Sequence, residues 1–130
     1  MIVYVDTSAV IKLVVDEPES NALAEELERF RHSDTLVASL LLHTELHCAA
    51  HRRLADVEPD TIGAVLSVLA LVDVERSDLL TAPLLPGRLR SADAIHLATA
   101  LRVGARGMVA YDSELSAAAA AAGIRVVSPN

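Results

Sequence analysis

Short apolar segments alternate with amphipathic segments along the whole chain. The run Ile2–Val5 is almost wholly apolar, which is typical of a strand buried on both faces. Four more short apolar runs predict strands at residues 35–38, 71–74, 108–110 and 125–127. The segments around them predict helices at residues 8–15, 19–31, 40–54, 60–69, 77–84, 91–103 and 113–122.

This alternation favours an α/β fold. Helical connections between successive strands imply a mainly parallel sheet of about five strands between helices on both faces, a three-layer α/β/α arrangement. No linker is long enough to divide the chain, so we expect residues 1–130 to form a single domain. Folds of this kind place ligands at the carboxyl ends of their strands, and Asp6 and Asp112 follow predicted strands at that edge.

Composition and charge narrow the class of protein. Apolar residues make up 52% of the chain and aromatic residues 2%, so Ala, Leu and Val should form the core. The net charge of −7 argues against indiscriminate nucleic-acid binding but allows a local basic patch beside bound cations. The single cysteine, Cys48, excludes an intrachain disulfide, favours a reducing cytoplasm, and is expected to pack as a small core residue. The start of the chain lacks the basic region of a signal peptide, and no apolar run approaches the roughly 20 residues of a membrane span, so a cytoplasmic protein without membrane contact is expected.

Four carboxylates lie within or beside apolar sequence: Asp6, Glu45, Asp93 and Asp112. An acidic group next to a buried segment destabilises the fold unless its charge is compensated. If the four converge from their scattered positions, they need a cation, and a divalent metal ion is the obvious candidate.

Each acid also has a simpler interpretation. Asp6 and Asp112 precede predicted helices and suit the N-cap position, and Asp93 lies in a first helical turn, where the helix dipole favours a negative charge. Glu45 is harder to explain in this way because leucines surround it on an apolar helix. The four signals are weak singly and stronger together. His96, three residues after Asp93, could line the cleft, but we expect it to pack within its own helix.

A ladder of histidines at spacing four, His43, His47 and His51, raises the possibility of zinc. The zinc protease pattern needs Glu directly after the first His, and Thr44 occupies that place. At about 100° per residue, Glu45 points roughly 160° away from the ladder. We therefore interpret the ladder as a polar outer or interface face.

Other acid-centred or nucleotide-binding enzymes lack their marks in this chain. A haloacid-dehalogenase-type phosphatase needs a second Asp where Ser8 stands, and no glycine-rich phosphate loop is present. A receiver domain expects a Lys near its end, whereas the only Lys is Lys12.

Four segments together resemble the PIN-domain family, and specifically the VapC-type toxin ribonucleases of bacterial toxin–antitoxin pairs. They are the opening Ile-Val-Tyr-Val-Asp6-Thr7-Ser8, residues 39–53 around Glu45, residues 89–100 around Asp93, and Tyr111-Asp112-Ser113-Glu114-Leu115 with the chain that follows. The resemblance runs nearly end to end. One departure is Ala110, where the family usually has Thr or Ser. We expect the hydroxyl of Thr7 or Ser8 to replace that function.

The resemblance implies a PIN-like fold and endonucleolytic cleavage of RNA that depends on Mg²⁺, with Mn²⁺ as a substitute. It also implies a cognate antitoxin and a homodimer. Hard oxygen ligands agree with these ions. Asp6, Asp93 and Asp112 are the expected metal ligands, and Glu45 is expected to bind a second ion or to orient the attacking water.

Contacts outside the acid cluster are also implied. Candidate phosphate contacts are Arg88 and Arg90 before the Asp93 helix and Arg52 and Arg53 at the end of the Glu45 helix, with ordinary surface arginines as the equal alternative. Leucine-rich helices near residues 23–30 and 40–46 are expected to supply apolar surface to partners. Two alternative functions stay open: a non-catalytic PIN-like module that binds RNA or an antitoxin, and a metal-dependent phosphatase.

Overall fold

A five-stranded sheet runs through the middle of the molecule. The computed structural model describes residues 1–52 and 57–130. Within them the strands stand in the order β3-β2-β1-β4-β5, and every pairing is parallel. The strand bounds are β1 Ile2–Val5, β2 Thr35–Ser39, β3 Ala70–Val72, β4 Gly107–Val109 and β5 Arg125–Val127. The predicted parallel sheet of about five strands is confirmed.

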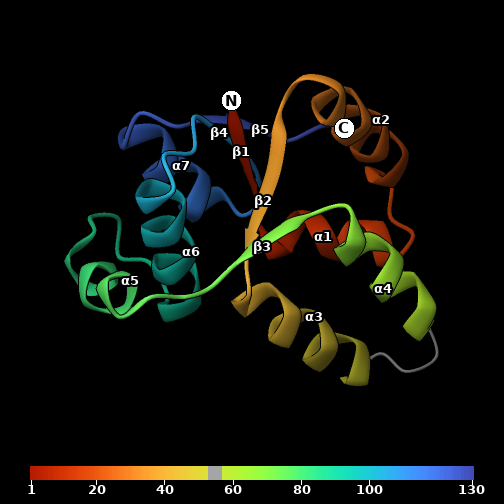
Figure 1. Cartoon of the computed structure of the whole chain (residues 1–130), viewed down its shortest axis with the longest axis horizontal. Coiled ribbons are helices and arrows are strands. Elements are labelled where there is room, and N and C mark those ends of the chain that lie inside the picture. The colour runs from red at the N-terminus through yellow and green to blue at the C-terminus, as the bar shows by residue number, and fades with distance from the viewer. Residues whose placement is uncertain (53–56) are drawn as a thin grey trace.

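Helices cover the sheet on both faces (Figure 1). Their bounds are α1 Thr7–Val14, α2 Ser20–Ser33, α3 Leu41–Arg52, α4 Pro59–Ser67, α5 Arg76–Thr81, the 3₁₀ turn η1 Ala82–Leu84, α6 Ser91–Arg102 and α7 Ser113–Ala121. The helix predicted at residues 77–84 is divided because Pro83 cannot donate a backbone hydrogen bond to the preceding turn. The end predicted for the helix at residues 40–54 lies outside the described residues.

Alternation along the central strand β1 creates the three layers. Val3 and Val5 pack among the buried residues of α1, α2, α3 and α4, whereas Tyr4 packs with residues of α6 and α7. All three side chains have no exposed surface, as expected for a strand that is covered on both faces.

The leucines of α2 and α3 belong to this core. The four that are buried are Leu23, Leu27, Leu42 and Leu46. The prediction that these helices offer their leucines to partners is therefore wrong for these positions, because the apolar stripe of each helix faces the sheet. The large exposed leucines are elsewhere, above all Leu79, Leu80 and Leu84 on α5 and η1.

Helix α5 is fixed to α6 by a buried ion pair. The Asp78 side chain accepts hydrogen bonds from Arg102 Nε at 2.8 Å and from Thr99 Oγ1 at 3.1 Å. Asp78 also accepts from the backbone N–H of Glu75 and so closes the first turn of α5. The exposed leucines of α5 are thus displayed on a rigid support.

The pairing of β1 with β4 places two sequence-distant loops side by side. Val5 pairs with Val109, and the backbone N–H of Asp6 donates to Val109 O at 3.0 Å. The loop that carries Asp112 follows directly. Among the described residues, no helix is long and apolar enough to cross a membrane.

Candidate active site

Asp6 combines a structural and a chemical role. It lies at the end of β1 as the N-cap of α1 and is 2% exposed. Its Oδ2 accepts hydrogen bonds from Ser8 N at 3.1 Å and Ser8 Oγ at 2.7 Å. Its Oδ1 is buried without a hydrogen-bond partner among the described residues. Capping therefore explains one oxygen and leaves the other available to a ligand, since a buried, unpaired carboxylate oxygen is costly.

Ser8 connects Asp6 to the opposite loop. Its Oγ donates to Asp6 Oδ2 and accepts from the backbone N–H of Tyr111 at 2.9 Å. Ala110 beside it is buried and offers no hydroxyl. Ser8 thus supplies the orientation of a carboxylate that we expected from Thr7 or Ser8.

Asp112 is the N-cap of α7, where its Oδ1 accepts from the backbone N–H of Leu115 at 2.8 Å. The capping interpretation is confirmed for both Asp6 and Asp112. Asp93 lies in the first turn of α6 and is half-buried. Burial and the negative charges of Asp112 and Asp6 raise the pKa of Asp93 to about 6. The three carboxylates are therefore close enough to repel one another.

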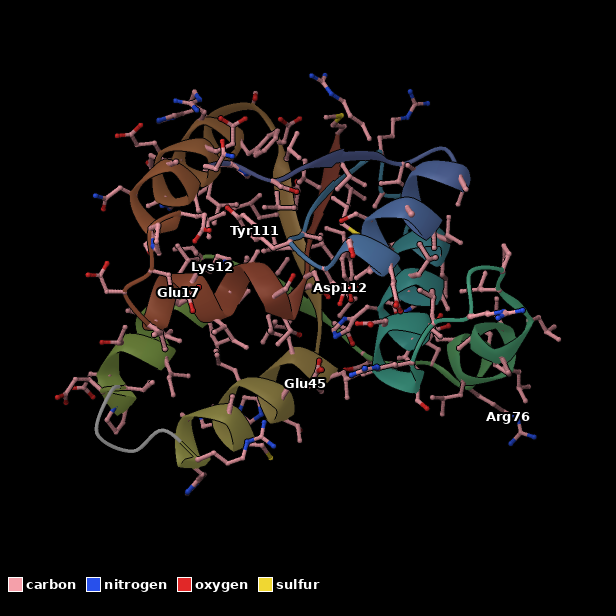
Figure 2. The ribbon with its side chains drawn as sticks, turned by 180° about the vertical axis from the view of Figure 1, so that it is seen from behind. Lys12, Glu17, Glu45, Arg76, Tyr111 and Asp112 are labelled. Atoms are coloured by element: carbon pink, nitrogen blue, oxygen red, sulfur yellow. The ribbon has the colours of Figure 1, made fainter. Side chains whose placement is uncertain are left out.

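The loop before Asp112 is held in place by Tyr111. The Nζ of Lys12 lies 4.7 Å from the centre of the Tyr111 ring and 2.7 Å from Glu17 Oε2. The Tyr111 hydroxyl donates to Pro129 O at 2.5 Å. Figure 2 shows Lys12 between Glu17 and Tyr111, with Asp112 next to them. These contacts fix the backbone from which Asp112 extends.

Glu45 reaches the same edge from α3, and its carboxylate is held by groups from two other helices. Its Oε1 accepts from Thr7 Oγ1 at 2.8 Å and lies 2.5 Å from His96 Nε2. The Nδ1 of His96 lies 2.6 Å from the hydroxyl of Tyr4. His96 is 1% exposed and joins α6 to β1 and α3, so the prediction that it packs only within its own helix is wrong. The spacing of three from Asp93 was the available signal, since it places both side chains on one face of α6.

The protonation of this chain follows from its contacts. Burial alone would raise the pKa of Glu45, but the hydrogen bond and charge of His96 and the hydrogen bond from Thr7 hold that pKa below its usual range. Burial opposes a charged imidazole, yet the bond to Glu45 and the nearby negative charges raise the pKa of His96. Burial and the charge of Asp6 raise the pKa of Tyr4, which stays a neutral phenol. Glu45 is therefore a stable carboxylate.

The donor set suits a hydrated Mg²⁺ or Mn²⁺. The available atoms are carboxylate oxygens, one of them buried and unpaired on Asp6, and the charges of Asp6 and Asp112 already disfavour the ionised form of Asp93. Within residues 1–52 and 57–130, no group of three or more His, Cys, Asp or Glu side chains is arranged to hold an ion by itself. Mg²⁺ does not need such a cage because it keeps several waters and uses one or two carboxylates together with substrate phosphate.

The histidine ladder is separate from the acids. His43 and His51 are exposed and His47 is half-buried, with its Nδ1 2.8 Å from His43 O. This placement agrees with a polar outer face. Cys48 is exposed, so the prediction of a core cysteine is wrong; the buried stripe of α3 passes through Leu42 and Leu46 instead.

The arginine candidates lie at the surface. Arg88 and Arg90 are exposed just before α6, and neither forms an ion pair with another described residue. Arg88 has a φ of 54°, an uncommon conformation for a residue other than glycine. Arg52 is exposed at the end of α3, and Arg53 lies outside the described residues.

Asp93 gives the metal-free protein a distinctive pH dependence. Its pKa is about 6 in the folded chain against an ordinary 3.8, so the folded state holds the proton more tightly. This contribution to stability is present at low pH and is lost as the pH rises through that range. In EDTA, Asp93→Asn should therefore raise the melting temperature relative to wild type more at about pH 7.5 than at about pH 4. Asp16→Asn, at an exposed position outside the cluster, is the control. An Asp93→Asn effect that is equal at both pH values would contradict the repulsion.

Comparison with known proteins agrees with this geometry. Residues 3–121 match the PIN domain family. Ribonuclease VapC35 of Mycobacterium tuberculosis is 40% identical over 98% of this chain and 96% of its own length. The structure of VapBC2 from Rickettsia felis, bound to a DNA fragment from their promoter, has a TM-score of 0.75 at 13% identity and full coverage of both chains. A toxin–antitoxin complex from Klebsiella pneumoniae has a TM-score of 0.72 at 21% identity, with 98% of each chain covered. The chain belongs to the PIN-domain family.

Proposed function

We propose that this chain is a VapC-type toxin endoribonuclease that hydrolyses RNA phosphodiester bonds with Mg²⁺, or Mn²⁺ in its place. The observation that carries the proposal is the unpaired, buried Oδ1 of Asp6 beside Asp93, whose pKa is raised by the charges of Asp6 and Asp112. Such a cluster is poised for a cation. The likeness to Ribonuclease VapC35 supports RNA as the substrate.

The side chains have distinct tasks in this reaction. Asp6, Asp93 and Asp112 would hold the ion, directly or through water, with Ser8 fixing Asp6 in advance. A bound divalent ion supplies charge stabilisation at the phosphoryl group and a more acidic water. Oε1 of Glu45 is already occupied by two partners, so Oε2 is the oxygen that can orient a water or a second ion.

Two partners complete the proposal. A cognate antitoxin is supported by the likeness to the toxin–antitoxin complex from Klebsiella pneumoniae. An apolar hollow of about 490 Å³ between α1, α2 and α4 contains none of the four acids and gives an antitoxin segment a place to dock. For a homodimer, the exposed leucines of α5 and η1 are the apolar surface, since the leucines of α2 and α3 named above are buried.

The acids can be tested singly. Asp6→Asn, Asp93→Asn and Asp112→Asn should each lower RNA cleavage by about 100-fold or more, because Asn keeps the capping oxygen but removes the charge that holds the ion. Cleavage of total RNA should be measured with Mg²⁺, Mn²⁺ or EDTA, and EDTA should abolish it. Asp16→Asn is the matched surface control. Wild-type rates in all three variants would exclude the metal site, and binding of RNA without any cleavage by wild type would favour the non-catalytic module.

The arginines separate RNA binding from chemistry. Replacing both Arg88 and Arg90 with Ala should weaken RNA binding and reduce its salt dependence by roughly 0.7 in slope for each lost phosphate contact on a single strand. Cleavage at saturating RNA should recover most of the wild-type rate, which is the sign of lost uniform binding. The control is the double Ala variant of Arg106 and Arg125, two exposed arginines at the opposite edge of the sheet. Equal effects of the two double variants would mean that only net charge matters.

The proposed dimer surface can be tested by charge. Leu80 is 61% exposed and Leu84 is 82% exposed. Changing both to Glu should convert a dimer into a monomer, because two charges would have to be desolvated in the interface. Light scattering after size exclusion gives the molar mass, and Ala121→Glu on the exposed side of α7 serves as the control. A dimer that persists in the double variant would place the contact elsewhere.

A further inference from the structure

Glu45 is held differently from the three aspartates. The hydrogen bonds to Asp6 and Asp112 come from within two or three residues of each, as expected of helix caps. Glu45 is instead fixed by Thr7, 38 residues away, and by His96, 51 residues away. Both contacts fall on Oε1, and no hydrogen bond from another described residue reaches Oε2. The carboxylate is thus fixed through one oxygen and presented through the other.

A second contact fixes the His96 ring from behind. A carboxylate can only accept, so the His96 nitrogen that faces Glu45, Nε2, carries the hydrogen. In the neutral ring Nδ1 is then an acceptor, and the buried Tyr4 hydroxyl at 2.6 Å can donate to it. The imidazolium also carries a hydrogen on Nε2, and the Tyr4 hydroxyl can rotate to accept from Nδ1. The orientation of the ring therefore does not depend on its protonation state.

This chain crosses all three layers of the fold. Tyr4 comes from the central strand β1, His96 from α6 on one face, and Glu45 from α3 on the other. Tyr4 has no exposed surface and His96 is 1% exposed, whereas the Glu45 side chain is 27% exposed. A partly exposed glutamate would otherwise sample several rotamers, and ordering such a side chain costs up to about 2 kcal/mol of conformational entropy. The buried Tyr4–His96 pair removes that freedom before RNA arrives.

We propose that His96, backed by Tyr4 and assisted by Thr7, is a positioning residue that holds Glu45 so that only Oε2 faces the reacting groups. The inference rests on the proposed ribonuclease function. His96 touches neither substrate nor ion in this role and acts through Glu45. Groups that orient a residue of a metal site from behind are typically worth 10- to 100-fold in activity.

The substitutions separate positioning from packing. His96→Leu removes both ring nitrogens, whereas His96→Gln can place its amide nitrogen near the position of Nε2 and still donate to Glu45. We expect His96→Leu to lower kcat by about 10- to 100-fold with little change in the KM for RNA, and His96→Gln to recover most of the loss. Tyr4→Phe keeps the ring of His96 and should lower kcat by only a few-fold.

The decisive comparison repeats His96→Leu in a Glu45→Gln background. If His96 acts through Glu45, its loss should cost less than about threefold there, since contacting residues in one network are not additive. An equal loss in both backgrounds, or a His96→Gln variant no better than His96→Leu, would overturn the proposal in favour of simple packing. If His96→Leu does not fold, Tyr4→Phe and Thr7→Val in the two backgrounds provide the same comparison.

A measurement without RNA keeps this inference separate from the proposed function. In ¹⁵N NMR of the histidine rings, the His96 Nε2–H proton should be protected from exchange and shifted downfield. The signal should move in Glu45→Gln, but hardly in Asp16→Asn. If wild type does not cleave RNA, the ribonuclease proposal fails, while an unchanged His96 signal in Glu45→Gln would overturn the positioning of Glu45 by itself.

Discussion

The site depends on the parallel pairing of β1 with β4. The register of Val5 opposite Val109, continued by the hydrogen bond from Asp6 N to Val109 O, brings residues more than 100 positions apart to one edge. Ser8 then joins the two loops through its bonds to Asp6 and to the backbone of Tyr111. A slip of one residue in this pairing would turn the side chains of β1 to the opposite faces, and both the core and the acid cluster would be lost.

Stability and chemistry compete within this cluster. Carboxylates that are close together destabilise the folded, metal-free chain, and the raised pKa of Asp93 is the measure of that repulsion. The capping bonds at Asp6 and Asp112 offset part of it, because each stabilises the helix that it begins. A bound cation would relieve the rest by binding only the folded state.

The sequence predicted the fold and the acids because their signals are local. Strand and helix positions follow from apolar spacing, and Asp6 and Asp112 could be placed because each comes directly after a predicted strand and before a helix. The task of His96 was missed because its partners Tyr4 and Glu45 lie 92 and 51 residues away, and no periodicity encodes such contacts. The leucines of α2 and α3 and the exposed Cys48 were misjudged because composition does not tell which face of a helix meets the sheet. The break at Pro83 needed only the proline rule and could have been anticipated.

Three of the four acids stand at the beginning of helices: Asp6 before α1, Asp93 in the first turn of α6 and Asp112 before α7. Each helix start carries a partial positive charge of about half a unit. An ion at this edge would therefore feel less attraction than the number of carboxylates suggests, and its exchange with solvent would be correspondingly easy. The same helix starts favour an incoming phosphate. The edge thus has two opposed preferences, and a cation together with a polyanion satisfies both better than either does alone.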